Sequence, residues 1–295
     1  MSVNIIGVFY SLLVAFVWGS APIIYRYCIA SSSALKMQAV RSIGFLGCGL
    51  VIAAFSPDIM RVAFHSAFLV SIGGLSALLV GDSLFFHGIK LIGPGTATAI
   101  TGTYPFFASV AAILFLGEKA TTATVVGTIC IFVGLVVFRM KKEEPKQKSL
   151  KGVLLALFAA FFWSVNFVLT RWGMTAGNIS PKALVFWQSI SFFISIWLCW
   201  GISWFRNGRQ EPFFKMPLKN MLMMITVGVL SMGLGGFLTS EAMRYAPASV
   251  VTPITASSPL FAAFWGRVLY REPILIPQWI GIVLILAGGV AINFG

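Results

Sequence analysis

Residues 104–118 read YPFFASVAAILFLGE, and residues 258–272 read SPLFAAFWGRVLYRE. Each stretch has a proline at its second position and a glutamate at its last, with a mostly apolar run between them. The two stretches are separated by an offset of 154 residues in a chain of 295. The recurrence of so specific a pattern at this separation indicates an internal duplication.

The duplication extends well beyond these two stretches. The offset of 154 continues on both sides of them, and an offset of 145 relates the beginnings of the two halves. The first offset pairs Lys90 with Arg244, Pro105 with Pro259, Phe107 with Phe261, Glu118 with Glu272, Gly127 with Gly281 and Gly134 with Gly288; the second pairs Gly7 with Gly152, Trp18 with Trp163 and Arg26 with Arg171. We therefore expect a first repeat over residues 1–140, a basic linker over 141–148 and a second repeat over 149–295.

The composition places both repeats in a membrane. The chain is 58% hydrophobic and only 10% charged, whereas about one quarter of the residues in a soluble domain are charged. Apolar runs of about 20 residues, the length of a membrane-spanning helix, recur along the whole chain. The expected spans are residues 4–27, 34–55, 67–89, 95–116, 121–139, 150–172, 182–204, 217–243, 248–270 and 277–294. The predicted fold class is an all-α polytopic membrane protein with ten transmembrane helices.

Each repeat contains five spans, and this odd number decides the topology. A second copy that follows five crossings enters the membrane from the opposite side, so the halves are inverted five-helix repeats. Inverted repeats are typical of secondary transporters, which bind substrate near the midplane at the repeat interface and rock around it. The sequence therefore favours a transporter over an enzyme or a receptor.

The net charge of +13 informs on the orientation of the chain in the membrane and does not indicate nucleic-acid binding. The basic residues lie in membrane loops, whereas nucleic-acid binding needs a basic face on a soluble surface. Loops after odd-numbered spans carry most of the basic residues, including those of the 141–148 linker. By the positive-inside rule these loops are cytoplasmic and both termini lie outside. The MSVN start lacks the basic region of a cleavable signal peptide, and we expect an integral multi-pass protein of the cell (inner) membrane.

Three stretches carry a resemblance to a known family. Residues 18–26 read WGSAPIIYR, residues 89–138 begin IKLIGPGTATAITGTYPFF, and residues 242–292 begin AMRYAPASVVTPITASSPLF. These stretches resemble the EamA repeat of the drug/metabolite transporter superfamily. The resemblance implies a ten-helix carrier of small metabolites, often an amino-acid or drug exporter, with a cavity lined mainly by the first, third and fourth helices of each half. The family's Trp-Gly pair is kept at Trp18 but becomes Trp-Ser at Trp163.

The prolines and glutamates of the duplicated pattern suggest separate roles. Pro105 and Pro259 lie within apolar runs, where a proline removes a backbone hydrogen bond and bends a helix. We expect them either to gate the cavity or to form packing kinks. Glu118 and Glu272 lie where a helix reaches the interface, a depth at which a charge costs little. A structural role, tying the turn to a basic group or to backbone amides, is favoured over substrate contact.

Ionisable residues within spans are candidates for binding and coupling, because a charge in the membrane is costly. Asp82 and Glu241 could each pair with a substrate ammonium or bind a coupling proton, and His87, which is equivalent to Glu241, could carry a proton. The alternatives are that Glu241 pairs with Arg244 and that His87 meets the headgroups. Arg41 either serves a carboxylate or snorkels to the cytoplasmic edge.

Aromatic and polar residues complete the predicted substrate site. Trp18 and Trp163 occupy equivalent positions and could form walls with cation–π capacity, or act as interfacial anchors. Asn166 needs a polar partner and therefore faces the bundle. Tyr104 and Ser258, which precede the two prolines, add hydrogen-bonding groups.

Several activities are not expected. The cysteines are scattered without metal-ligand spacing, so neither a metal site nor a cofactor is predicted. No phosphate-binding loop, HExxH motif or nucleophile elbow is present, so ATP hydrolysis or other enzymatic activity is not expected. The favoured function is export of small metabolites such as amino acids by alternating access, with protons as the candidate coupling ion. The alternatives are an importer or exchanger of another small solute, or a membrane scaffold or lipid-handling protein.

Overall fold

Ten helical spans make up the chain in the computed structural model, which describes residues 4–28, 33–92, 94–119, 121–138, 149–206, 216–270 and 276–293. The first half contains α1 (Ile5–Cys28), α2 (Ala34–Phe55), the short η2 (Pro57–Arg61), a third span of α3 (Phe64–Leu75), η3 (Ser76–Gly81) and α4 (Asp82–Ile92), a fourth of α5 (Pro94–Thr101) and α6 (Tyr104–Leu116), and α7 (Thr122–Phe138). The second half contains α8 (Leu150–Thr175), α9 (Pro181–Arg206), a span of α10 (Leu218–Val227), η5 (Gly228–Leu234) and α11 (Gly235–Tyr245), a span of α12 (Ala248–Thr255) and α13 (Ser258–Tyr270), and α14 (Ile276–Asn293).

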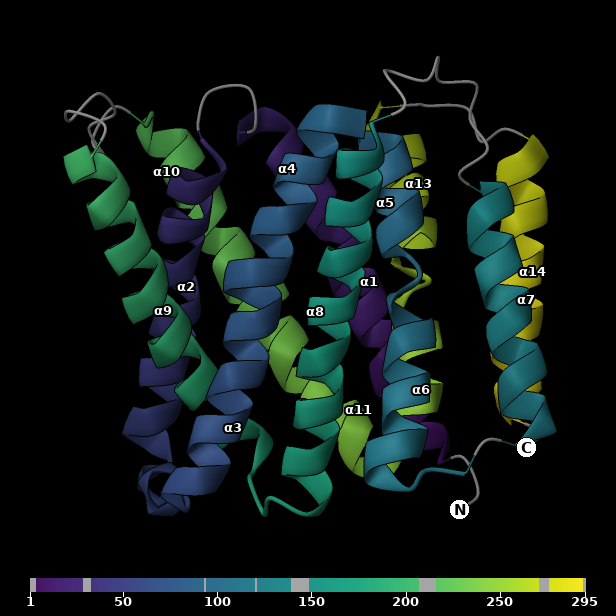
Figure 1. Cartoon of the computed structure of the whole chain (residues 1–295), viewed down its shortest axis with the longest axis horizontal. Coiled ribbons are helices and arrows are strands. Elements are labelled where there is room, and N and C mark those ends of the chain that lie inside the picture. Colours follow the sequence, from purple (N-terminus) through teal and green to yellow (C-terminus); the bar gives the residue numbers. More distant parts are fainter. Residues whose placement is uncertain are drawn as a thin grey trace.

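The two halves cross the membrane in opposite senses. In Figure 1, α1 begins at the lower edge and α7 ends towards the upper edge, whereas α8 begins at the upper edge and α14 ends at the lower edge. The helical content, the ten spans and their inversion confirm the predicted fold class.

The outer surface is suited to lipid. Six of the described spans are long and apolar enough to cross a bilayer, and four shorter apolar helices complete the set. Large apolar side chains face outwards, such as Phe115 at 78% exposure and Val283 at 62%. In water such a surface would favour aggregation, but in a bilayer it contacts acyl chains. The main buried cluster lies inside, where α6, α8, α11 and α12 meet, and it includes residues of α7 and α14.

The third span of each half contains a π-helical segment at an equivalent position. These segments are η3 in the first half and η5 in the second, and each continues directly into the following α-helix. A π-helical turn shifts the register of the hydrogen-bond ladder and is often found at functional sites. The inverted symmetry therefore includes a local distortion of the backbone as well as the order of the helices.

The fourth span of each half is broken near its centre. The sequence predicted one bent helix over 95–116, but α5 ends at Thr101 and α6 begins at Tyr104. Pro105 therefore lies in the first turn of α6, where a missing N–H is tolerated. The Thr103 hydroxyl donates to the carbonyl of Ile100 at 2.7 Å, which partners a backbone group at the break.

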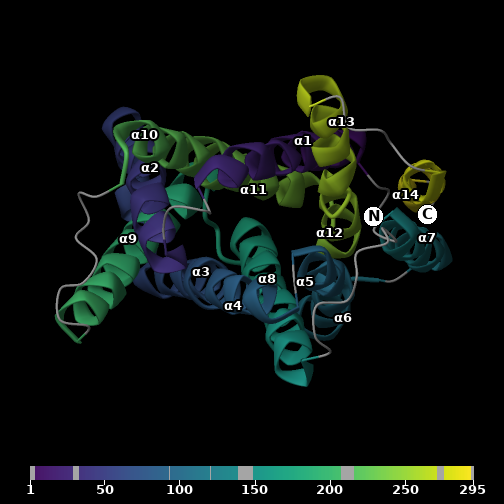
Figure 2. The same ribbon diagram turned by 90° about the horizontal axis from the view of Figure 1, so that it is seen from above.

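Two close helix contacts fix the packing. Gly44 of α2 faces α10, and Gly228 faces the carbonyl of Arg41, so closely that an added Cβ would lie 2.1 Å and 2.0 Å from backbone oxygens. On the other side, α7 and α14 pack against each other through Gly134 and Gly288. Figures 1 and 2 show this α7–α14 pair at one end of the molecule, where it contacts α12 of the remaining spans. Small residues let membrane helices approach this closely.

Candidate functional site

Asp82 is the first residue of α4, directly after the π-helical segment η3. It lies ten residues before the end of α4, or about 15 Å along the helix at 1.5 Å per residue. Its Oδ2 atom is 2.5 Å from a guanidinium nitrogen of Arg41, and its Oδ1 atom accepts a hydrogen bond of 3.0 Å from Nε1 of Trp163. The side chains of Arg41 and Asp82 are only 7% and 14% exposed. A charge at this depth requires such a partner.

The partners of Asp82 come from both repeats. Arg41 is on α2 of the first half, whereas Trp163 is on α8 of the second half. Of the two alternatives for Arg41, the structure therefore places it with a carboxylate. One turn away on α2, Gln38 is fully buried, and its amide nitrogen is 3.4 Å from the Ser83 hydroxyl. Its buried amide oxygen has no hydrogen-bond partner among the described residues.

An aromatic wall extends from Trp163 through the repeat interface. Trp163 meets Tyr104 edge-on at 6.3 Å, Tyr104 stacks on Phe167 at 5.2 Å, and Phe167 meets Trp18 edge-on at 6.0 Å. The Tyr104 hydroxyl donates to the carbonyl of Thr252 at 3.2 Å. The structure thus brings together four of the predicted substrate-binding residues, namely Trp18, Asp82, Tyr104 and Trp163. Phe167 was missed, because nothing in the sequence distinguishes it among 27 phenylalanines.

Two predicted polar residues lie outside this cluster. The Asn166 side-chain oxygen accepts a hydrogen bond of 2.9 Å from Gln188, which also donates to the carbonyl of Val70 at 3.1 Å. Asn166 therefore joins α8 to α9 and α3. Ser258 begins α13, and its carbonyl faces Gly19 of α1, where an added Cβ would lie 2.4 Å from it. Both positions are helix contacts.

His87 and Glu241 are equivalent in the repeats but lie towards opposite edges of the molecule, as the positions of α4 and α11 in Figure 1 indicate. The His87 side chain is exposed, and its Nδ1 atom is 2.7 Å from the carbonyl of Ser83. Glu241 forms an ion pair of 3.2 Å with Arg244, one turn away. Because the repeats are inverted, His87 and Glu241 lie at opposite ends of the spans and do not form one site, although they are equivalent in the repeats.

Glu118 lies just after α6 and joins the two repeats at the edge of the molecule that is lowest in Figure 1. Its Oε1 accepts hydrogen bonds from the backbone N–H of Ala248 at 2.8 Å and from Nε of Arg171 at 3.2 Å. Its Oε2 accepts from the backbone N–H and hydroxyl of Ser249 at 3.1 and 2.8 Å. These amides begin α12, so the carboxylate also faces the positive end of a helix dipole. Arg171 in addition donates to the carbonyl of Met243.

We call this group of contacts the Glu118 clasp. Both charged side chains are less than 10% exposed, so neither retains a full hydration shell. Glu272, the equivalent of Glu118, lies outside the described residues.

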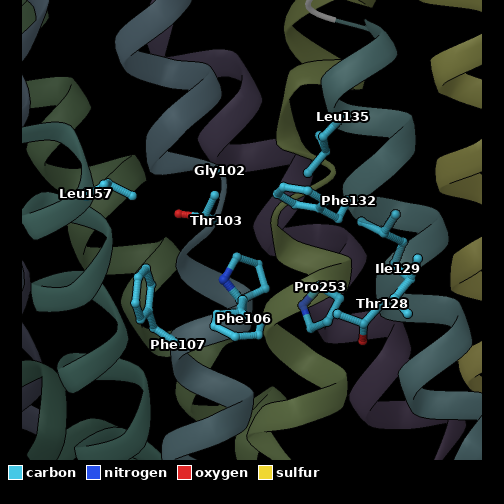
Figure 3. Close-up of a pocket in the computed structure, with 12 residues that line it drawn as sticks. Gly102, Thr103, Phe106, Phe107, Thr128, Ile129, Phe132, Leu135, Leu157 and Pro253 are labelled. Carbon is cyan, nitrogen blue, oxygen red and sulfur yellow. The ribbon is translucent and has the colours of Figure 1, made fainter. Parts of the chain in front are cut away.

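The broken fourth span borders an apolar cavity of about 290 Å³. Figure 3 shows Phe132 and Ile129 of α7 on one side of it, and Thr103 and Phe107 on the other. Pro105 also lines the cavity, and Pro253 of α12 closes it from the second repeat. No lining residue is charged, so the cavity suits apolar groups and is distinct from the Asp82 site.

A metal centre is not found in the part of the chain that the structure describes, where no three His, Cys, Asp or Glu side chains gather. The described chemistry is that of a buried ion pair beside an aromatic wall. Such an arrangement can bind a charged organic group and its apolar part.

The inverted repeats and the buried charges across them define a polytopic membrane transporter. The model of the EamA-like transporter family matches residues 5–140 and again residues 150–294. The chain belongs to the EamA-like transporter family.

Relatives of this chain are themselves named as transporters. It is 22% identical to an uncharacterized transporter of Archaeoglobus fulgidus over 94% of both chains. It is 26% identical to the uncharacterized transporter YvbV of Bacillus subtilis, over 96% of this chain and 91% of YvbV. It is 24% identical to the uncharacterized inner membrane transporter YhbE of Escherichia coli K12, over 96% and 89%. A solved crystal structure of a protein with 15% sequence identity shares the fold, with a TM-score of 0.82. The match covers 98% of this chain and 96% of the chain in that structure.

Proposed function

We propose that this transporter exports small zwitterionic or cationic metabolites, such as amino acids, across the cell (inner) membrane by alternating access. The observation that carries the proposal is the buried Arg41–Asp82 pair, which meets an indole of the opposite repeat. Buried ionisable groups in a membrane mark substrate or proton pathways. We also infer that the protein has no enzymatic activity and that its substrate is a small molecule.

The paired charges would recognise both ends of an amino acid. Asp82 would bind the ammonium group and Arg41 the carboxylate, so that the substrate replaces the contact that the two side chains make with each other. This exchange keeps each buried charge paired, which avoids the large cost of an isolated charge. The unpartnered amide oxygen of Gln38 offers a further acceptor beside them.

The aromatic wall would receive the apolar part of the substrate. Tyr104 and Phe167 stack at 5.2 Å, and Trp18 and Trp163 flank them. Aromatic faces contact apolar groups well and attract organic cations. Asn166 and Ser258, which pack between helices, would support the wall instead of touching substrate.

Alternating access would use the breaks in the fourth spans. Pro105 and Pro259 each lie at the start of a second half-helix, and the two halves could pivot at these breaks as the repeats rock. The Glu118 clasp would hold the lower edge closed while substrate enters from the upper side. Glu118 is therefore structural in this scheme, and a structural role is also proposed for Glu272, its equivalent in the second repeat.

Protons are the proposed coupling ion, and Asp82 is the residue proposed to exchange them with solution as access alternates. His87 and Glu241, which lie towards opposite edges, would act as relay groups at the entrances. Asp82→Asn keeps the size of the side chain and its hydrogen bonding but removes the charge.

The Asp82→Asn variant tests the proposal in proteoliposomes supplied with a ¹⁴C-labelled amino-acid mixture. If Asp82 carries protons, proton-driven accumulation should vanish while exchange of amino acid for amino acid continues. If Asp82 binds the ammonium group, both modes should be lost. Wild-type rates of both modes in the variant would exclude either role for Asp82.

A further inference from the structure

The tryptophans of the first spans occupy glycine notches in the opposite repeats. A Cβ added at Gly81, the last residue of η3, would lie 2.7 Å from Cδ1 of Trp163. A Cβ added at Gly235, the residue directly after η5, would lie 2.5 Å from Nε1 of Trp18. Only glycine leaves room for an indole at these distances. The two notches are equivalent in the repeats, so both indoles enter a third span beside its π-helical segment.

The two indoles differ in what they bind. Nε1 of Trp18 donates to the backbone carbonyl of Ser231 at 3.0 Å. Nε1 of Trp163 donates at the same distance to the Asp82 carboxylate, which is also held by Arg41. Gly236, the residue equivalent to Asp82, has no side chain. The two repeats therefore share this backbone geometry, but only the first repeat has a charged side chain at this position.

We propose that Trp163 is a positioning residue for Asp82 and that Gly81 is the notch that admits it. The indole N–H engages Oδ1 and so fixes the plane of the carboxylate, while Oδ2 faces Arg41. This inference rests on the proposed function, because it concerns the carboxylate that would receive the substrate cation.

The hydrogen bond from Trp163 to Asp82 would link the ability of Asp82 to bind substrate to the relative position of the two repeats. Asp82 belongs to the first half and Trp163 to the second, so a relative displacement of the halves alters the hydrogen bond. A hydrogen bond loses most of its strength when the donor moves by about 1 Å or turns away from the acceptor. The carboxylate is thus oriented for substrate in one arrangement of the repeats and released in the other.

Trp163→Phe tests the proposal, because phenylalanine keeps an aromatic ring and removes the N–H. Trp265→Phe is the matched control, since Nε1 of Trp265 also donates across the repeats, to the Ser20 hydroxyl at 2.8 Å, away from Asp82. The measurement is the KM and maximal rate of exchange of a ¹⁴C-labelled amino-acid mixture by proteoliposomes.

We expect Trp163→Phe to raise KM by about 10- to 100-fold, the range for a lost hydrogen bond to an ionised group. The maximal rate should change less than KM, and Trp265→Phe should change KM by less than about threefold, as expected for a hydrogen bond between neutral groups remote from the substrate. In an Asp82→Ala background, which removes the acceptor of the indole N–H, Trp163→Phe should cause no further change in the unfolding temperature that this hydrogen bond would explain, since residues that act through one contact are not additive.

Gly81→Ala provides a second variant in case Trp163→Phe does not fold. Its added Cβ would displace the indole, whereas a Cβ added at Gly88 of the same span approaches no atom closer than 3.4 Å. Gly81→Ala should raise KM as Trp163→Phe does, and Gly88→Ala should not.

The outcomes separate this inference from the proposed function. Active wild-type vesicles in which both Trp163→Phe and Gly81→Ala have the KM of their controls would overturn the positioning role alone. Wild-type vesicles that exchange no more label than protein-free vesicles would overturn the proposed function and this inference with it.

Discussion

Alanine substitutions at two glycines of α2 should differ in their effect on stability: one should destabilise the protein and the other should not. A Cβ at Gly44 would lie 2.1 Å from the carbonyl oxygen of Ile225, whereas ordinary contact begins at 3.4 Å, so the helices must separate by about 1 Å. Overpacking of this kind costs about 1–3 kcal/mol. A Cβ at Gly47, one turn further on, would meet no atom within 4 Å. Gly47→Ala should stabilise the helix by up to about 1 kcal/mol through helix propensity.

The assay is thermal unfolding of the purified variants in one detergent. At about 2–4 °C per kcal/mol, Gly44→Ala should lower the unfolding temperature by about 2 to 12 °C, and Gly47→Ala should leave it unchanged or raise it. Gly44→Ala should also disturb Arg41, which lies one turn before it on the same helix. An unfolding temperature of Gly44→Ala equal to that of Gly47→Ala would refute the close packing of α2 against α10.

Three further predictions concern the clasp, the breaks and the orientation. Glu118→Gln should lower the free energy of unfolding by about 3 kcal/mol, because it removes one partner of a buried pair. Glu241→Gln should lower it by less than about 1 kcal/mol, because its partner Arg244 is 47% exposed. Equal losses in the two variants, measured by thermal unfolding, would contradict the role of the clasp. Pro105→Ala and Pro259→Ala should slow transport while ligand binding survives, and wild-type turnover in both variants and in the double variant would reduce the prolines to packing kinks. A cysteine in the 141–148 linker should resist membrane-impermeant reagents in sealed cells, and ready labelling there would reverse the assigned orientation.

The spans were predictable because their information is local. A run of about 20 apolar residues has few alternatives to a membrane helix, and an odd number of spans per repeat requires inversion. The expected span over 34–55 coincides with α2, and the others differ from the observed helices by a few residues. The break between Thr101 and Tyr104 was not predicted in this form. It depends on hydroxyl groups that bond to local carbonyls and on the contact of Tyr104 with α12.

The candidate site was predicted only in its parts. Asp82 and Arg41 were recognised as costly charges, but their pairing depends on how α2 packs against the third span, which no local pattern encodes. The glycine notch at Gly81 depends on the π-helical segment before it, and this segment has no sequence pattern of its own. Asn166 was expected to face the bundle and does so, with Gln188 as its partner.

Counterflow in proteoliposomes tests the central claim most directly. Vesicles containing the purified protein are loaded with an unlabelled amino-acid mixture and diluted into a trace of the ¹⁴C-labelled mixture. A carrier that works by alternating access exchanges internal for external substrate, so the label should accumulate transiently above its external concentration and then leak away. Label that only equilibrates, or that enters no faster than into protein-free vesicles, would contradict transport of amino acids by this protein.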